Sequence, residues 1–309
     1  MMAGDRESGP NRASLEAVAE RLRAGGRLAS GDAAVLAATP DLVALGALAD
    51  DRRRALRGDR VTFVRVCEID AVAGGAGQDR LPPRAGEVRL VGRPADIGAA
   101  VAETSRLREL AGPVPITGFA LDDLVDLCRA DAAAVREALG ALREAGLARV
   151  AEARADAGDD PRWIELAVAE DLPVARLTVA SADSDGLANA RRIAAWGAAA
   201  ASVRAFAPLP AVAGPRPSTG YDDLRRVALT RLVVDNIDSI QVDWRLYGPK
   251  LAQVALTFGA DDVDAVSPID ALEHGWRRTP LEEITRNVSA AARVPIERNG
   301  RFEIGTARP

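Results

Sequence analysis

Short segments with alternating apolar and polar residues recur along most of the chain. They are separated by longer stretches in which apolar residues repeat every three or four positions, the spacing typical of helices. The alternating segments predict strands at residues 61–69, 88–92, 115–119, 147–152, 174–180, 203–209, 239–244 and 264–269. Strands that alternate with helices favour a parallel sheet with helices outside, and seven or eight such units fit a closed α/β barrel of the TIM type, complete or incomplete.

Three regions follow from this pattern. Residues 1–12 are polar and contain Gly and Pro, which predicts a disordered N-terminus. Residues 13–58 have helical spacing, and we expect an N-terminal helical extension that acts as a lid or brace. Residues 59–309 form the predicted (β/α) barrel, which ends in a β-hairpin around Asn299-Gly300.

Residues 235–264 join a strand, a helix and an acidic loop. The apolar Ile240 and Val242 alternate with polar neighbours in the strand. Gly248 and Pro249 then predict the start of a helix, because proline at the first helical position gives up an N–H that has no partner there. One helix face is expected to be buried through Leu251, Val254, Ala255 and Phe258.

This part of the chain resembles a known family. The runs DNI, GPKLAQVAL and FGADD, and a late PIER, resemble the C-terminal half of the aminofutalosine synthases and the cyclic dehypoxanthine futalosine synthases. These are radical S-adenosylmethionine enzymes of the futalosine route to menaquinone, and deazaflavin-forming synthases are close relatives. The resemblance extends through YDDLRRVALTRL, VRLVGRP and ALRGDRVTFV, so it covers most of the chain and implies a barrel.

The resemblance also implies cofactors that this sequence lacks the residues to hold. Family members carry a CxxxCxxC loop after the first barrel strand, whose thiolates hold a four-iron four-sulfur cluster that binds S-adenosylmethionine. Residues 71–83 contain no cysteine, and the chain has only Cys67 and Cys128, far apart in sequence. Arg93 stands where the family usually has a second glycine. We therefore expect a divergent, cluster-less member that binds neither the cluster nor S-adenosylmethionine.

Candidate site residues are sought at the C-terminal ends of the strands, where barrel enzymes place their active sites. They are Gln241, Asp243, Lys250, Gln253, Asp261, Asp262, Asp264 and His274. Lys250 is the only lysine and His274 the only histidine in a chain rich in arginine, so Lys250 either needs an ammonium group or survives by chance. Asp261 and Asp262 are alternatively solvated turn residues, and His274 a surface residue. No spacing of ligands predicts a metal site.

Charge excludes two classes of partner. The chain has 40 basic and 45 acidic residues and a net charge of −5, without a basic block. Neither nucleic acid nor an anionic membrane is therefore an indicated partner. Because no apolar run is long enough to span a bilayer, a cytoplasmic location is expected.

Two functions remain open at this stage. In the first, the protein is a non-radical partner or regulatory subunit, either as a homodimer or in complex with a cluster-bearing paralogue. Loss of the cluster loop would expose apolar strand ends at the barrel mouth, which is typical of an interaction site. Association is expected through the barrel mouth or through the N-terminal helices between Ser14 and Leu56. In the second, it is a cofactor-independent enzyme that acts on a futalosine-like nucleoside in the barrel mouth.

Overall fold

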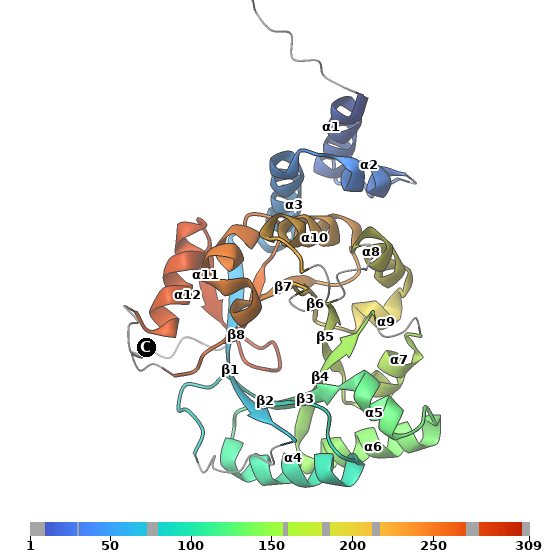
Figure 1. Cartoon of the computed structure of the whole chain (residues 1–309), viewed down its shortest axis with the longest axis vertical. Coiled ribbons are helices and arrows are strands. Elements are labelled where there is room, and N and C mark those ends of the chain that lie inside the picture. Colours follow the sequence, from blue (N-terminus) through green and yellow to red (C-terminus); the bar gives the residue numbers. More distant parts are fainter. Residues whose placement is uncertain are drawn as a thin grey trace, which may run out of the picture.

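Eight parallel strands close into a barrel in the computed structural model, which describes residues 10–29, 31–72, 80–156, 160–180, 186–211, 217–269 and 278–304 (Figure 1). The ring closes because β1 pairs with both β8 and β2. This confirms the predicted TIM-type barrel. The strands are β1 (Arg60–Asp70), β2 (Glu87–Val91), β3 (Ile116–Ala120), β4 (Leu147–Arg154), β5 (Val174–Val179), β6 (Ala205–Pro208), β7 (Ser239–Asp243) and β8 (Asp262–Val266).

Helices surround the strands, and the main apolar core fills the layer between them (Figure 1). They are α4 (Ile97–Ala111), α5 (Leu121–Leu127), α6 (Ala132–Ala145), α7 (Arg162–Ala169), α8 (Gly186–Ala195), α9 (Ala198–Ala201), α10 (Gly220–Val233), α11 (Trp244–Ala255) and α12 (Pro280–Ala290). Threonines form capping boxes at α10 and α12, as their sequences predict. Within the described ranges, no helix has the length and apolar content needed to cross a membrane.

A ninth strand, β9 (Val294–Glu297), lies beside the barrel. It pairs in parallel with the first residues of β1, whereas β2 pairs with the last residues of β1. The predicted hairpin is therefore reduced: after β9 the chain turns at Asn299 and returns through a single antiparallel bridge between Arg298 and Ile304. This short C-terminal segment, residues 298–304, lies near the N-terminal ends of the strands, which we call the barrel floor.

The N-terminal helices form a small core of their own outside the ring. They are α1 (Pro10–Arg23), α2 (Asp32–Ala38) and α3 (Leu42–Arg57), and their leucines pack on Leu229 and Leu232 of α10. Asp41 caps α3 by accepting a hydrogen bond of 2.9 Å from the Ala44 N–H. In Figure 1 α3 stands beside α10, and α1 and α2 lie farther from the barrel.

The junction of β7 and α11 differs from the prediction. The strand ends at Asp243, and Trp244 already belongs to the helix because the Asp243 carboxylate caps it. Gly248 interrupts the helix with φ 70° and ψ 158°, so Pro249 begins its second segment rather than the whole helix. The buried face was also wrong in part, since Val254 is 41% exposed and Ala252 is buried in its place.

Candidate functional site: the barrel lumen and its mouth

The barrel lumen is lined by charged side chains instead of apolar ones. β8 begins at Asp262 and not at Asp264, so the expected acidic loop and the strand at 264–269 are both corrected. Asp262 and Asp264 are fully buried and bond to groups from other strands, while Val263 between them packs in the outer core. Carboxylates at this depth need cations, because an unpaired buried charge is very costly.

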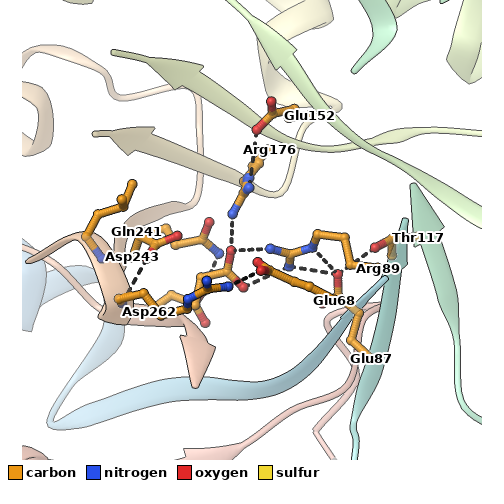
Figure 2. A network of polar contacts seen from close by, with 12 residues as sticks. Glu68, Glu87, Arg89, Thr117, Glu152, Arg176, Gln241, Asp243 and Asp262 are labelled. Carbon is orange, nitrogen blue, oxygen red and sulfur yellow. Dashed lines mark hydrogen bonds and ion pairs between the residues drawn. The ribbon is translucent and has the colours of Figure 1, made fainter. Parts of the chain in front are cut away.

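Arginines from β2 and β5 converge on Asp264. Figure 2 shows the two arginines, Arg89 and Arg176. The Arg89 guanidinium donates two parallel hydrogen bonds of 2.8 Å to the two oxygens of Asp264. Arg176 donates to the same carboxylate and lies 3.2 Å from Glu152 of β4. A bidentate arginine pair of this kind is strong and fixes the relative position of both strands.

Glu87 extends this network along β2. Its carboxylate accepts a hydrogen bond of 2.7 Å from Arg89 Nε and one of 2.5 Å from the Thr117 hydroxyl on β3 (Figure 2). Side chains of β2, β3, β4, β5 and β8 are thereby joined in one buried group. It fills the lumen beneath the C-terminal face, where barrel enzymes place their active sites.

The network shifts the pKa values of its members in opposite directions. Burial alone would raise the pKa of Asp264, but the charges of Arg89 and Arg176 outweigh it and hold that pKa well below its usual range. Burial alone would lower the pKa of Arg89, but Asp264 and Glu87 raise it further above its usual value. Asp264 is therefore a fixed anion at neutral pH and unsuited to proton transfer.

A second group of polar contacts lies closer to the floor. Arg298 donates two hydrogen bonds of 2.7 Å to Asp262, and the Gln241 amide donates another of 2.6 Å. The hydroxyl of Thr62 on β1 also bonds to this carboxylate. The C-terminal segment thus closes the lumen from below.

Backbone strain accompanies the network at two positions. Phe119 in β3 has φ 62° and Ala265 in β8 has φ 57°, the left-handed region that non-glycine residues rarely adopt. Ala265 directly follows Asp264, and Phe119 lines the cavity at the mouth. Strain of this kind persists where the surrounding contacts fix the backbone, as the pairing of Asp264 does here.

Above the network, a cavity of about 440 Å³ opens at the C-terminal ends of β2, β3 and β4. Arg89, Glu152 and Arg176 line the bottom of this cavity, on the side of the network. Its rim includes Arg93, Asp123 and Arg154. Arg154 donates a hydrogen bond of 2.5 Å to Asp123 at this rim. We call this space the mouth cavity.

A second hollow of about 410 Å³ adjoins the mouth cavity and shares part of its rim. Both are lined by Arg93, Asp123 and Arg154, and the second is also lined by Trp163 and Trp196. Together they present flat aromatic surfaces next to guanidinium groups. This combination suits a polar ligand that contains a planar ring.

The predicted site residues are brought together only in part: Gln241 bonds to Asp262 and Asp243 pairs with Asp264 along the strands, whereas the other described ones lie elsewhere. Gln241 lies in the lumen, and Asp243 ends β7 with its carboxylate accepting from the Arg245 and Leu246 N–H groups at 2.9 and 3.0 Å. Burial and the nearby charge of Asp264 raise the pKa of Asp243.

Asp261, expected in a loop at the mouth, lies instead at the barrel floor, directly before β8. It accepts hydrogen bonds from the Ser239 hydroxyl at 2.7 Å, the Ile240 N–H at 2.9 Å and Arg57 Nε at 3.0 Å. Its carboxylate fastens the start of two strands to α3. Neither the loop position nor the solvated-turn alternative describes this buried group.

Lys250 and Gln253 lie on α11, outside the ring of strands, and neither lines the mouth cavity. Lys250 is exposed. His274 lies outside the described residues.

The sequence interpretation missed the arginines of the lumen and the mouth. Glu87 and Arg89 alternate with Val88 and Leu90 in β2, which is the period-of-two signal of a strand with one polar face. The same reasoning applied to every strand would have placed Arg89 and Arg176 inside the barrel. Their pairing with Asp264 could not be read from the sequence.

The residues present do not match the donor set of an iron–sulfur cluster. Such clusters are held by several converging thiolates, and the full sequence supplies two cysteines. Cys67 is buried within β1 and Cys128 ends α5, and neither forms a disulfide. Burial, with the charge of Asp131, raises the pKa of Cys128, which disfavours its thiolate.

Comparison with known proteins places the family signal in the C-terminal part. Residues 211–299 match the family described as CofH/MqnC C-terminal region. Residues of this chain are 37% identical over 90 positions to aminodeoxyfutalosine synthase of Thermus thermophilus, covering 28% of this chain and 24% of that protein. A 5-amino-6-(D-ribitylamino)uracil–L-tyrosine 4-hydroxyphenyl transferase of Methanothermobacter thermautotrophicus is 39% identical over 89 positions, 26% of this chain and 24% of the relative. The matches thus span about a quarter of each relative's length. The family match confirms the resemblance for residues 211–299, and it does not reach the runs VRLVGRP and ALRGDRVTFV upstream.

Solved structures extend the likeness to the whole fold. Methylornithine synthase is similar with a TM-score of 0.65 at 15% identity, covering 90% of this chain and 97% of that one. The hydrogenase maturase HydG is similar with a TM-score of 0.62 at 12% identity, covering 94% and 77%. At such low identity the likeness concerns the fold alone.

Proposed function

We propose that this chain is a non-radical relative of the futalosine-pathway synthases that acts as a partner or regulatory subunit, because residues 211–299 match the family described as CofH/MqnC C-terminal region. The observation that carries the proposal is the lumen. Its centre is filled by the Arg89–Asp264–Arg176 network, and the whole chain has two cysteines. A barrel of this kind keeps the family's fold without the donor set for the cluster.

Exposed apolar residues at the mouth support a docking role. Val72 is 70% exposed, Leu246 42% and Ile269 46%. They follow β1, β7 and β8, which are neighbours in the barrel, so the three residues belong to one side of the mouth. Contiguous apolar surface at a barrel end is typical of an interaction site. We propose that a cluster-bearing paralogue covers it.

Co-expression with such a paralogue tests this function. The two chains should co-purify, and light scattering should give the mass of a heterodimer. Leu246→Glu, which puts a charge into the contact, should weaken the complex at least tenfold. Val43→Glu is the matched control, because Val43 is 77% exposed on α3 in the separate N-terminal core.

Iron analysis after anaerobic reconstitution with iron and sulfide completes the test. We expect no stoichiometric cluster in this chain alone. A four-iron cluster bound to this chain, or a protein that stays monomeric and never co-purifies with the paralogue, would contradict the proposed function.

The mouth cavity favours a second candidate function, catalysis or binding of a futalosine-like nucleoside. Its supporting observation is the guanidinium rim next to Trp163 and Trp196. Calorimetric titration with futalosine-type nucleosides should then show binding that Arg154→Gln weakens and Lys250→Ala leaves unchanged. If no heat of binding is detected at millimolar nucleoside, this second function is excluded and only the partner or regulatory role remains.

A further inference from the structure

The barrel floor carries an excess of arginine although the chain as a whole has a net charge of −5. A small cavity of about 130 Å³ opens there, among the N-terminal ends of β1, β6, β7 and β8. Its charged lining residues are Arg57, Arg60, Arg204, Arg298 and Asp261. At about 30 Å³ for each water molecule, the cavity has room for a single small ion with its solvent and not for a nucleotide.

Two of these arginines already have carboxylate partners. Arg57 binds Asp261 at 3.0 Å, and Arg298 forms the bidentate pair with Asp262. Arg60 and Arg204 have no ion pair with any residue that the structure describes. Among the described residues, the cavity therefore keeps a positive charge that no carboxylate pairs with.

The C-terminal segment places an aromatic ring, Phe302, beside two of these arginines. The Phe302 ring lies 3.8 Å from the Arg298 guanidinium and 6.0 Å from that of Arg204, and it lines the cavity between them. The aromatic ring holds both cations by cation–π attraction and restricts their motion. Two guanidinium groups are thus pre-positioned on one small space.

Arg149 of β4 is a half-buried cation that lies close enough to Arg204 and Arg298 to be repelled by both. Burial and the positive charges of Arg204, Arg301 and Arg298 lower its pKa, and Glu303 is the acid that opposes them. The Nε atom of Arg149 is buried and has no hydrogen-bond partner among the described residues. Buried donors without partners are uncommon in folded proteins and call for an explanation such as a bound ion.

We propose that the floor cavity binds a small oxyanion, a phosphate or a carboxylate group, between Arg60 and Arg204, beside the Arg298–Asp262 pair. A guanidinium group presents paired N–H donors that match the geometry of both anions. The anion would neutralise the repulsion that Arg149 experiences from Arg204 and Arg298. It would also fasten the C-terminal segment, which supplies Arg298 and Phe302, to the strands above.

Thermal unfolding of the full chain in inorganic phosphate or succinate, at ionic strength held constant with sodium chloride, tests the proposal. One of the two anions should raise the Tm in a saturable manner, and the responding anion identifies the group that binds. Arg204→Gln should weaken the apparent affinity about tenfold or more, and Arg149→Gln should weaken it in the same direction.

Arg191→Gln on α8 is the control, because it removes the same charge from an exposed arginine away from the floor. If Arg149→Gln does not fold, Arg204→Gln still decides, since its exposed side chain makes no ion pair with the described residues. The proposal is overturned if neither anion shifts the Tm beyond chloride, or if the shift survives unchanged in Arg204→Gln.

Discussion

Arg89 and Asp264 lie 175 positions apart in the chain and face each other across the barrel lumen, joined by two hydrogen bonds of 2.8 Å. β2 and β8 flank β1 on opposite sides, so this pair bridges strands that do not touch through their backbones. Two parallel hydrogen bonds form only if the edge of the guanidinium group is aligned with the two oxygens of the carboxylate. The pair therefore fixes the barrel's closure from within.

Asp264→Asn should destabilise the protein by about 3–5 kcal/mol, because it leaves Arg89 and Arg176 as buried cations without their shared anion. Urea unfolding gives the free energy. Glu170→Gln is the control, since it removes an exposed ion pair with Arg136 and should cost no more than about 1 kcal/mol. Equal effects of the two substitutions would show that the lumen pair contributes no more than a surface pair.

The Asp264 carboxylate should also make the free energy of unfolding depend on pH. Its folded-state pKa is depressed below the unfolded value of about 3.9, so its contribution to stability is present above that pH. The contribution is lost as the pH falls through the folded pKa. The difference in unfolding free energy between wild type and Asp264→Asn should be constant from pH 7 to 5 and shrink below pH 4. A difference that grows on acidification would contradict this sign.

Local signals predicted the elements of the fold well. Thr219 and Thr279 form capping boxes with Asp222 and Glu282, the acidic residues three positions later. Such caps depend on residues three positions apart, so they can be read from sequence. The alternation of strand and helix likewise required only local periodicity, and it gave the closed barrel.

The site was predicted poorly because its contacts are long-range. The segment containing Asp262 and Asp264 resembles a solvated acidic loop by itself, and only Arg89, Arg176 and Arg298 make it a buried strand. No pattern within the segment reports those partners. Lys250 was a candidate because it is the only lysine in the chain. The rarity of a residue type does not indicate which face of a helix the residue lies on.

Gly300→Ala should disturb the floor. A Cβ at this position would lie 2.8 Å from Cγ of Glu87, whose carboxylate is held by Arg89 and Thr117. Because Glu87 cannot move freely, we expect a loss of about 1–3 kcal/mol in unfolding free energy. Gly140→Ala is the control: its Cβ would meet no atom within 4 Å in α6, and it should stabilise by about 0.4–1 kcal/mol. A neutral Gly300→Ala would show that Glu87 can shift without loss.

Asp243 should show the opposite pH behaviour to Asp264, although the two carboxylates are neighbours. Burial and the charge of Asp264 raise its pKa, so its ionised form weakens the fold at neutral pH. Asp243→Asn removes this charge and keeps an oxygen that can cap α11, since Asn caps about as well as Asp. The variant should therefore be more stable than wild type at pH 7.

The gain from Asp243→Asn should fade as the pH falls through the raised folded-state pKa of Asp243. It should be lost below the unfolded value of about 3.9, where the carboxyl group is protonated in both folded and unfolded chains. Asp243→Ala removes both the charge and the helix cap, whereas Asp243→Asn removes only the charge. The Ala variant should therefore have a free energy of unfolding about 0.5–2 kcal/mol lower than the Asn variant. Urea unfolding of the three proteins at pH 7 and pH 4 measures these differences. A variant Asp243→Asn that is less stable than wild type at pH 7 would contradict the prediction. It would show that the hydrogen bonds of the ionised carboxylate with the Arg245 and Leu246 N–H groups stabilise the fold by more than burial and repulsion from Asp264 destabilise it.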